Sequence, residues 1–430
     1  MLRFLYGKWI YHDLLASVAG EYYDAAVHIV RGNFCQTRLS PGMIWLTALW
    51  LRILGISPLS VIIGMAGIYG LFVWQTDRLL RYLGMRSVTN LFHLIFAIYP
   101  AFIHASVSPV PDLPIAVGLL AIANYLWQIY HKEKTALADL LGLGTMLGLT
   151  FLFSGGVIWV FPVIAGFLIW KYQSALINAM IPLLVSLVIM GGWEISANHC
   201  AKRWVWGNDT TGEDFFTGNN AFTPLYRTWW LDTENESNNP YYQRYYHLRE
   251  EIISLPPEER QAGYFAKAWE HIRSRPDLFL IRTANRIRCF FAFDTLPGKG
   301  WTTGFSPLMV VFAGLNTICY TFLSLLAIWG IVGRGSPINK PLRMTMLLMI
   351  PAFGIPHFLT FSLPALHLPI MPFLGLFAAV ALVRETPRLF SLKGLSKRSR
   401  PFVYLMFLSF LYIQVEWIAQ MIDRYIGQSL

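Results

Sequence analysis

The sequence predicts an all-α integral membrane protein, with about eleven transmembrane helices and one large loop on the outer side. Three features indicate this fold class. Only 13% of the 430 residues are charged, while 55% are hydrophobic. A soluble domain carries about a quarter charged residues. Phe, Trp and Tyr together make up 15% of the chain, a load typical of membrane interfaces. Long apolar runs also recur along a chain whose mean hydropathy is +0.47.

Apolar runs near the length of a membrane span, about 20 residues, divide the chain. We expect residues 1–40 to form an outer N-terminal segment, 41–193 to hold spans 1–7, 194–306 to form the large outer loop, and 307–430 to hold spans 8–11. The predicted spans lie near residues 41–56, 57–75, 88–106, 113–130, 136–152, 155–171, 175–193, 307–332, 343–359, 364–383 and 401–420.

The placement of Lys and Arg predicts the orientation of these spans. Cytoplasmic loops of membrane proteins are enriched in both residues. Turns near 106–113, 152–156 and 357–368 contain neither, so we expect them outside, together with residues 1–40 and 194–306. The remaining loops are basic and explain the net charge of +10, so we expect no nucleic-acid partner. The basic residues of these loops are Arg78, Arg81, Arg86, Lys132, Lys134, Lys171, Arg334, Lys340, Arg343, Arg384, Arg388, Lys393, Lys397, Arg398 and Arg400.

The long outer loop, residues 194–306, reads as a folded, mixed-charge surface. It holds fourteen of the twenty-four acidic residues beside thirteen Lys and Arg. Pro257 followed by two glutamates predicts a helix start, and Pro276 ends that helix. Three side chains share one face at helical spacing: Phe265, Trp269 and Ile272. A second stretch mixes aromatic and apolar residues with arginines, and we expect it to lie flat on the membrane.

Four cysteines have no metal-ligand spacing, and their positions leave the redox state open: Cys35, Cys200, Cys289 and Cys319.

Acidic residues in the predicted outer pieces are the first candidates for chemistry. Glu21 and Asp24 are three residues apart and share one face of a helix. Either carboxylate suits a general base, although solvated acids on a surface helix are the plain alternative. Asp112 stands in an otherwise uncharged turn, where it suits an N-cap as well as a functional role.

Polar and basic residues on the same side are candidates for holding a phosphate. His357 and His367 suit phosphate binding or proton transfer, and a structural role is the alternative. Asn219 and Asn220 follow Gly218 in what is otherwise a turn. Three arginines suit a lipid phosphate or an ordinary surface: Arg203, Arg227 and Arg286.

Taken together, the layout resembles the polytopic glycosyltransferases of the GT-C class, in particular the bacterial family 39 and aminoarabinose-transferase-like group. The matching positions are Glu21, Tyr22, Ala26, Ile29 and Gly32, then Pro41-Gly42, Asp112, Gly218-Asn219-Asn220, the stretch from Ala268 through Arg275-Pro276 to Phe279, and Leu368 to Phe373. Two positions depart from the family: Val18 replaces a frequent catalytic Asp, and Ala365-Leu366-His367 replaces an Arg-aromatic-Arg run.

The resemblance implies transfer of a sugar from a polyprenyl-phosphate carrier to a hydroxyl of a glycan, lipid or protein, on the periplasmic face of a bacterial inner membrane, with inversion. Glu21 or Asp24, and then Asp112, would be the base, while Arg and His side chains would stabilise the departing phosphate. The sequence contains no nucleotide-binding loop. A lipid-linked donor would explain this absence, because its leaving group is a lipid phosphate and not a nucleotide. No cofactor is required, and a divalent cation, Mg²⁺ or Mn²⁺, at Asp112 is left open.

Three other functions are compatible with the topology. A lipid or polysaccharide transporter would usually place ionisable groups at mid-membrane depth, and the predicted spans contain few. A non-catalytic scaffold derived from the transferase fold would account for Val18, which stands where the family often has a catalytic Asp. A ligase for lipid-linked polymers would act on longer saccharides.

Overall fold

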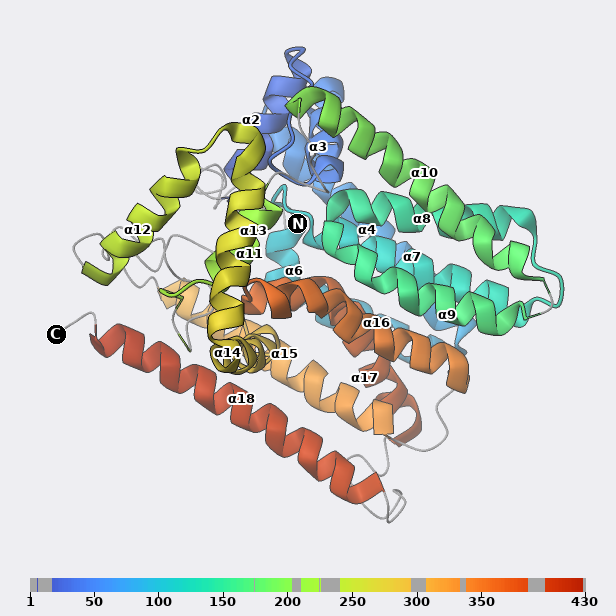
Figure 1. Cartoon of the computed structure of the whole chain (residues 1–430). Coiled ribbons are helices and arrows are strands. Elements are labelled where there is room, and N and C mark those ends of the chain that lie inside the picture. The colour runs from blue at the N-terminus through green and yellow to red at the C-terminus, as the bar shows by residue number, and fades with distance from the viewer. Residues whose placement is uncertain are drawn as a thin grey trace.

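The structure is a computed structural model that describes Tyr6 and residues 18–173, 175–202, 210–223, 225, 240–294, 307–332, 338–385 and 399–427. Every regular element in these ranges is a helix, and the long helices form a bundle (Figure 1). Arg203 and Arg227 lie outside the described residues.

Seven helices among the described residues are long and apolar enough to cross a membrane. They are α4 (Pro58–Tyr82), α7 (Asp112–His131), α10 (Leu176–Ala201), α15 (Pro307–Val332), α16 (Lys340–Leu359), η5 with α17 (Pro364–Ile370 and Met371–Glu385) and α18 (Ser399–Gly427). Three shorter apolar helices are α3 (Pro41–Leu54), α8 (Leu137–Phe153) and η2 with α9 (Gly155–Val160 and Phe161–Lys171). The predicted fold class is confirmed, although seven rather than eleven segments reach span length.

The predicted span 88–106 is broken into two short helices. α5 (Thr89–Ile98) ends at Tyr99, whose backbone is extended, and α6 (Pro100–Ala105) begins directly afterwards. Proline lacks the backbone N–H that continues a helix, and it pushes the preceding residue out of the helical region. Neither half is long enough to cross a bilayer alone.

Glycines bring the helices of the bundle into close contact. α8 packs between α7 and α10, and α15 packs against α17 (Figure 1). A Cβ at Gly144 of α8 would meet the backbone of Pro182 at 2.9 Å, and one at Gly148 would meet Ile189 at 2.8 Å. Small residues at such crossings let helix backbones approach, which is how helices associate in lipid.

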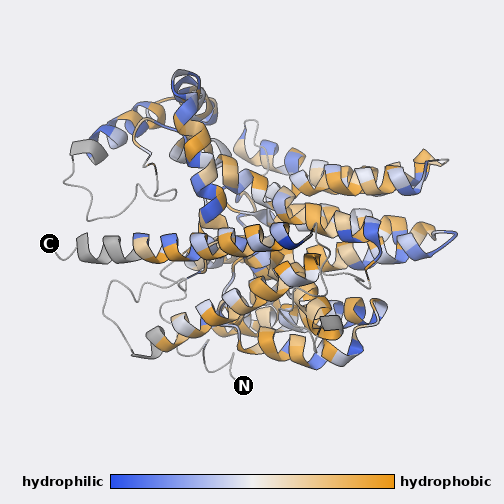
Figure 2. Ribbon diagram, turned by 90° about the horizontal axis from the view of Figure 1, so that it is seen from below, coloured by the Kyte–Doolittle hydropathy of each residue, from blue (hydrophilic) through white to orange (hydrophobic). Residues whose placement is uncertain are grey.

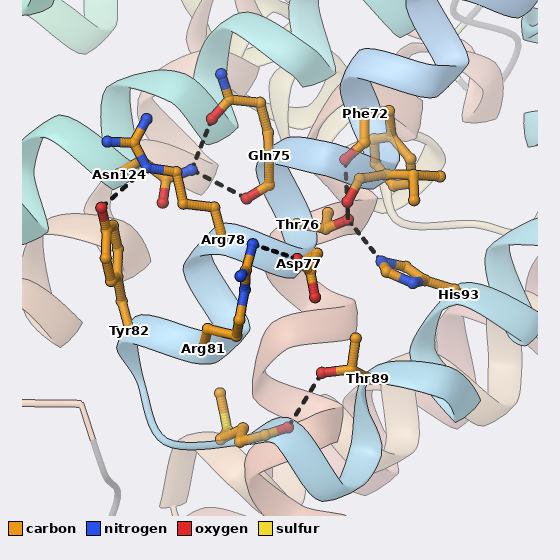
Figure 3. Close-up of polar contacts among 12 residues, drawn as sticks. Phe72, Gln75, Thr76, Asp77, Arg78, Arg81, Tyr82, Thr89, His93 and Asn124 are labelled. Atoms are coloured by element: carbon orange, nitrogen blue, oxygen red, sulfur yellow. Dashed lines mark hydrogen bonds and ion pairs between the residues drawn. The ribbon is translucent and has the colours of Figure 1, made fainter.

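Several polar side chains within the bundle are paired with one another (Figure 3). Asn124 of α7 is 1% exposed, and its Nδ2 donates to Oε1 of Gln75 on α4 at 2.8 Å. Oγ1 of Thr76 lies 3.0 Å from Nε2 of His93 on α5. Because hydrocarbon offers no hydrogen bonds, such pairing is what permits polar groups at membrane depth.

Two helices present their apolar faces outward. Only 22% of the apolar window of α10, and the same share of α18, is buried inside the protein. Exposed side chains include Val188 on α10 and Leu408 and Val415 on α18. Figure 2 shows hydrophobic residues along the long helices. These faces suit contact with lipid chains.

Five shorter helices lie at one end of the bundle: α2 (Val18–Val30), α11 (Thr211–Gly218), α12 (Pro240–Ile253), α13 (Pro257–Ser274) and α14 (Pro276–Phe290). α13 begins and ends where the prolines predicted. Its buried side chains are Tyr264, Ala268 and Ile272, whereas Trp269 is 48% exposed. Ile272 of the predicted face is buried, and both Phe265 and Trp269 contact the ring of Phe215 on α11.

A disulfide joins Cys35, in the loop after α2, to Cys200, at the end of α10. The Cα atoms are 5.2 Å apart although 165 positions separate the two cysteines. Cys289 and Cys319 are free and buried. The pairing could not be predicted, because cysteine spacing alone does not define connectivity.

Candidate functional site

The charge of Asp294, in the segment after α14, reaches Asp112 at the start of α7. The two charges are close enough to repel each other. Tyr22 of α2 lies within reach of the charges of Asp112 and Glu21. Tyr6 and Tyr99 lie within reach of the charge of Asp294. We call Asp112, Asp294, Tyr6, Tyr22 and Tyr99 the outer carboxylate site, after the side of the membrane that the charge pattern predicts for the turn near Asp112.

Asp112 is placed by the turn between α6 and α7. It is the first residue of α7, while Pro111 occupies the N-cap position without a side-chain capping bond. The predicted N-cap role is therefore wrong by one residue, because α7 begins directly after Pro111. At this position the carboxylate still lies at the positive end of the helix dipole. The backbone N–H of Ser108 donates to the carbonyl oxygen of His104 at 3.0 Å and fixes the start of the turn.

His104 braces this turn against the N-terminal segment. Its Nε2 lies 3.2 Å from Oγ of Ser108, and its Nδ1 lies 3.1 Å from Oη of Tyr6. The Tyr6 ring stacks on Phe312 of α15, with ring centroids 5.6 Å apart. Both ring nitrogens of His104 are thus engaged, which holds the turn carrying Asp112 in one orientation.

The segment that carries Asp294 is held by α15 and α18, and Asn316 of α15 connects it to α6. The N–H of Phe293 donates to Oε1 of Gln414 on α18 at 2.9 Å. Nδ2 of Asn316 on α15 donates to the carbonyl oxygen of Asp294 at 2.7 Å, while its Oδ1 accepts from the N–H of Ala101 on α6 at 2.9 Å. Asp294 is not among the predicted site residues, and its only signal in the sequence is its place soon after a basic, aromatic helix.

Tyr99 adds a buried hydroxyl to the outer carboxylate site. Its side chain is 0% exposed, and among the described residues its hydroxyl has no hydrogen-bond partner. An uncompensated buried hydroxyl is costly, so a polar ligand beside Asp294 would satisfy it.

The two acids of α2 lie on its exposed face, as their spacing predicted. The other face buries Tyr22 and Ala26 against α3. Burial raises the pKa of the Tyr22 phenol, and a hydrogen bond with Ser40 opposes this shift. Tyr22 lies within reach of the charge of Glu21 as well as that of Asp112.

Arg286 and Asn219 form a buried structural junction. Arg286 is 0% exposed, and its Nη1 donates to the carbonyl oxygen of Leu359 at 3.1 Å and to Oδ1 of Asn219 at 3.2 Å. Its Nη2 donates to the carbonyl oxygen of Gly218. A Cβ at Gly218 would collide with the carbonyl oxygen of Thr360. Burial lowers the pKa of Arg286 to about 9. Its visible role is to lock the turn after α11 to the end of α16.

Arg282 locks the other half of the same turn. Its Nη1 donates to the carbonyl oxygen of Asn220 at 3.0 Å and lies 3.1 Å from Nε2 of His271. Nδ2 of Asn220 donates to the carbonyl oxygen of Phe216 at 2.9 Å. Hydrogen bonds within the protein therefore hold the turn Gly218-Asn219-Asn220 in place.

The two candidate histidines support the end of α14. Nδ1 of His367 lies 2.7 Å from the carbonyl oxygen of Phe290, and its ring stacks on Tyr320 at 4.6 Å between centroids. His357 stacks on Phe290 at 5.8 Å. Because α14 ends shortly before Asp294, both histidines influence the outer carboxylate site through the backbone that carries Asp294.

The outer carboxylate site contains two carboxylates that could be metal ligands, Asp112 and Asp294. Among the residues that the structure describes, no group of three or more His, Cys, Asp and Glu is placed to hold a metal ion. Mg²⁺ commonly uses one or two carboxylates together with substrate phosphate oxygens. Asp112 and Asp294 fit that smaller donor set.

Asp214 of α11 gives a testable dependence of stability on pH. Burial raises its pKa from 3.8 to about 6, although a hydrogen bond from Thr210 opposes the shift. The folded state therefore binds this proton more tightly than the unfolded state, so stability falls as pH rises from about 4 to 6. We expect Asp214→Asn to raise the melting temperature at pH 7.5 and to have little effect at pH 4.5, measured by intrinsic fluorescence.

The neighbouring acid provides the control for this prediction. Glu213 pairs with Arg249 at 2.5 Å, so Glu213→Gln should lower the melting temperature at pH 7.5. An Asp214→Asn variant without a gain at neutral pH would contradict the prediction.

Comparisons with known proteins identify two similar solved structures. No family model matches the chain, and no curated protein matches it. ArnT from Cupriavidus metallidurans, bound to undecaprenyl phosphate, is 14% identical with a TM-score of 0.47, covering 86% of this chain and 56% of its own. The oligosaccharyltransferase AglB from Archaeoglobus fulgidus, in complex with an inhibitory peptide and a dolichol-phosphate, is 13% identical with a TM-score of 0.46, covering 92% and 50%. The chain spans about half the length of each.

Proposed function

We propose that this protein is a membrane glycosyltransferase that moves a sugar from a polyprenyl-phosphate carrier to an acceptor hydroxyl on the outer face of its membrane. The observation that carries the proposal is the outer carboxylate site, where Asp112 and Asp294 meet beside buried phenols. The motifs around Tyr22, Asp112 and Gly218 resemble those of the GT-C class and support the choice of reaction.

The reaction needs one base and no covalent intermediate. One carboxylate of the pair accepts the proton of the acceptor hydroxyl. The acceptor oxygen then bonds to the anomeric carbon, and the bond from that carbon to the phosphate oxygen breaks with its electron pair. The carrier phosphate leaves, and the configuration at the anomeric carbon inverts.

Asp112 is our first choice for the base, with Asp294 as its partner. When both carboxylates are ionised they repel each other, which favours the protonated form of one of them. Such a pair can take up the acceptor's proton and pass it on. Glu21 and Asp24 remain candidates at the edge of the site, as does a divalent cation held by the two aspartates with the donor phosphate.

The disulfide supports placing this site outside the cytoplasm. Disulfides persist in oxidising compartments and are rare in the cytosol. Cys35 follows the helix that carries Tyr22, so the outer carboxylate site would lie on the same side as the disulfide.

Labelling of intact cells or spheroplasts tests this orientation. We expect a membrane-impermeant maleimide to label Cys35 and Cys200 only after treatment with an impermeant reductant. Cys35→Ser/Cys200→Ser is the control and should remain unlabelled. Labelling that requires permeabilised membranes would contradict the orientation.

A transfer assay tests the function itself. Purified full-length protein in liposomes would receive radiolabelled polyprenyl-phosphate sugars and an extract of lipids and glycans. Label moving from the carrier to an acceptor would support the proposal. Uptake of an intact carrier across the bilayer without transfer would instead indicate a transporter. Carrier binding with neither result would indicate a scaffold.

A further inference from the structure

Asn316 is a buried amide inside an apolar helix. It is the only Asn, Gln, His or charged residue of α15, and it lies within the apolar window of span length. Its side chain is 0% exposed. Hydrocarbon offers no hydrogen bonds, so a polar group at such a position is retained only where it has partners. The partners of Asn316 therefore indicate its role.

Both ends of this amide reach the backbone of other elements. Its Oδ1 accepts from the N–H of Ala101 on α6 at 2.9 Å, and its Nδ2 donates to the carbonyl oxygen of Asp294 at 2.7 Å. An N–H can only donate and a carbonyl oxygen can only accept, so a single orientation of the amide satisfies both contacts. Asn316 thus bridges two backbone segments that are far apart in the sequence.

The contact to Ala101 fixes the segment that leads to Asp112. Ala101 is the second residue of α6, so its N–H has no acceptor within that helix. Backbone hydrogen bonds continue from α6 into the turn before α7, where the N–H of Ser108 donates to the carbonyl oxygen of His104 at 3.0 Å. The turn leads directly to Asp112, the first residue of α7.

The contact to Asp294 is distinct from the one that Gln414 of α18 makes to the same segment. Oε1 of Gln414 accepts from the N–H of Phe293 at 2.9 Å, and its Nε2 donates to the carbonyl oxygen of Phe291 at 2.9 Å. Neither of these contacts reaches α6. Gln414 therefore ties the segment to α18, whereas Asn316 ties it to the segment that leads to Asp112.

We propose that Asn316 is a positioning residue that sets the separation of the Asp112 and Asp294 carboxylates. The inference rests on the proposed function, in which the two aspartates act on one substrate. Asn316 would act through the two backbone segments and not through contact with that substrate. A planar amide with both ends engaged holds these segments at a fixed spacing, and a misplacement of about 1 Å can cost about 100-fold in rate.

Chemical cross-linking tests the geometry without requiring activity. The full-length protein in detergent would carry Asp112→Cys/Asp294→Cys, and a short bis-methanethiosulfonate reagent would join the two introduced thiols. Mass spectrometry of the joined peptides distinguishes them from the four native cysteines, which are paired in the disulfide or buried. We expect Asn316→Leu, which has a similar shape but no hydrogen-bonding group, to slow cross-linking about tenfold because both backbone partners are released.

The matched control is the next residue of the same helix. Oγ1 of Thr317 donates to the carbonyl oxygen of Ala313 at 3.0 Å, within α15. Thr317→Val should therefore leave the rate of cross-linking and the rate of transfer unchanged.

Kinetics in liposomes test the consequence for the reaction. Asn316→Leu should lower kcat for sugar transfer about tenfold or more, while the KM for the donor stays within a few-fold of wild type. Asn316→Gln keeps a donor and an acceptor on a longer arm. It should have a higher melting temperature than Asn316→Leu but should still lose kcat, because it holds the two segments at a different spacing.

The two measurements separate this inference from the proposed function. Cross-linking that is equally fast in wild type, Asn316→Leu and Asn316→Gln would overturn the positioning role, as would slow cross-linking together with wild-type kcat. Cross-linking that depends on Asn316, in a protein that transfers no sugar, would overturn the proposed function and leave the bridge between the two segments standing.

Discussion

Asp112→Asn is expected to lower kcat for sugar transfer at least 100-fold while leaving the KM for the donor within a few-fold of wild type. General-base catalysis contributes typically 10²–10⁴-fold to a rate. Asn has nearly the same shape but cannot accept the proton. Because Asp112 is the first residue of α7, and Asn is as well accepted as Asp at helix starts, the substitution should not disturb the helix. The measurement is steady-state transfer in liposomes.

Asp294→Asn should also lower kcat, and combining it with Asp112→Asn tests whether the two aspartates work as a unit. We expect a loss of similar size, with the double variant little worse than either single one, because residues that work as a unit give non-additive losses. Glu250→Gln, on the exposed surface of α12, is the control and should retain full activity. If Glu21→Gln or Asp24→Asn abolishes transfer while Asp112→Asn does not, the base belongs to α2 instead.

A substitution at Val18 tests the role of Asp112 by restoring activity instead of removing it. It begins α2 and is 58% exposed, one helical turn before Tyr22. An acid at this position is frequent in the GT-C relatives that the sequence resembles. If Asp112 has taken over that role, Val18→Asp should restore part of the activity of Asp112→Asn.

The fold class and several helix boundaries could be predicted because they depend on local chemistry. Hydropathy marks spans, since every backbone group in lipid must be paired within the segment. Prolines mark the ends of α13 and the start of α14 for the same local reason. Pro100 carried an equally local signal for the break after α5, but the surrounding apolar run suggested one continuous span.

The site was harder to predict because its members meet only in the folded chain. Asp294 becomes a candidate through its proximity to Asp112, which no spacing reveals. The disulfide between Cys35 and Cys200 is likewise a contact across most of the first seven predicted spans. Arg286 resembles an ordinary surface arginine in sequence, but tertiary packing buries it completely.

Arg286→Met is expected to reduce the free energy of unfolding by about 3 kcal/mol, since it leaves buried acceptors without donors. The carbonyl oxygens of Gly218 and Leu359 and the amide oxygen of Asn219 would each lose a hydrogen bond. Burying the guanidinium is itself costly, as its lowered pKa of about 9 indicates, so removing the charge offsets part of this loss. The melting temperature in detergent measures the net effect.

Arg286→Lys separates this structural role from the phosphate-binding role that the sequence suggested. A lysine keeps the charge but cannot reproduce the forked geometry that reaches three acceptors. If Arg286 is structural, Arg286→Lys should lower the melting temperature and leave the KM for the donor unchanged. If it binds the donor phosphate, the KM should rise while the melting temperature changes little. Arg275→Met, directly before the same helix and 54% exposed, should alter neither, because exposed ion pairs contribute less than about 1 kcal/mol.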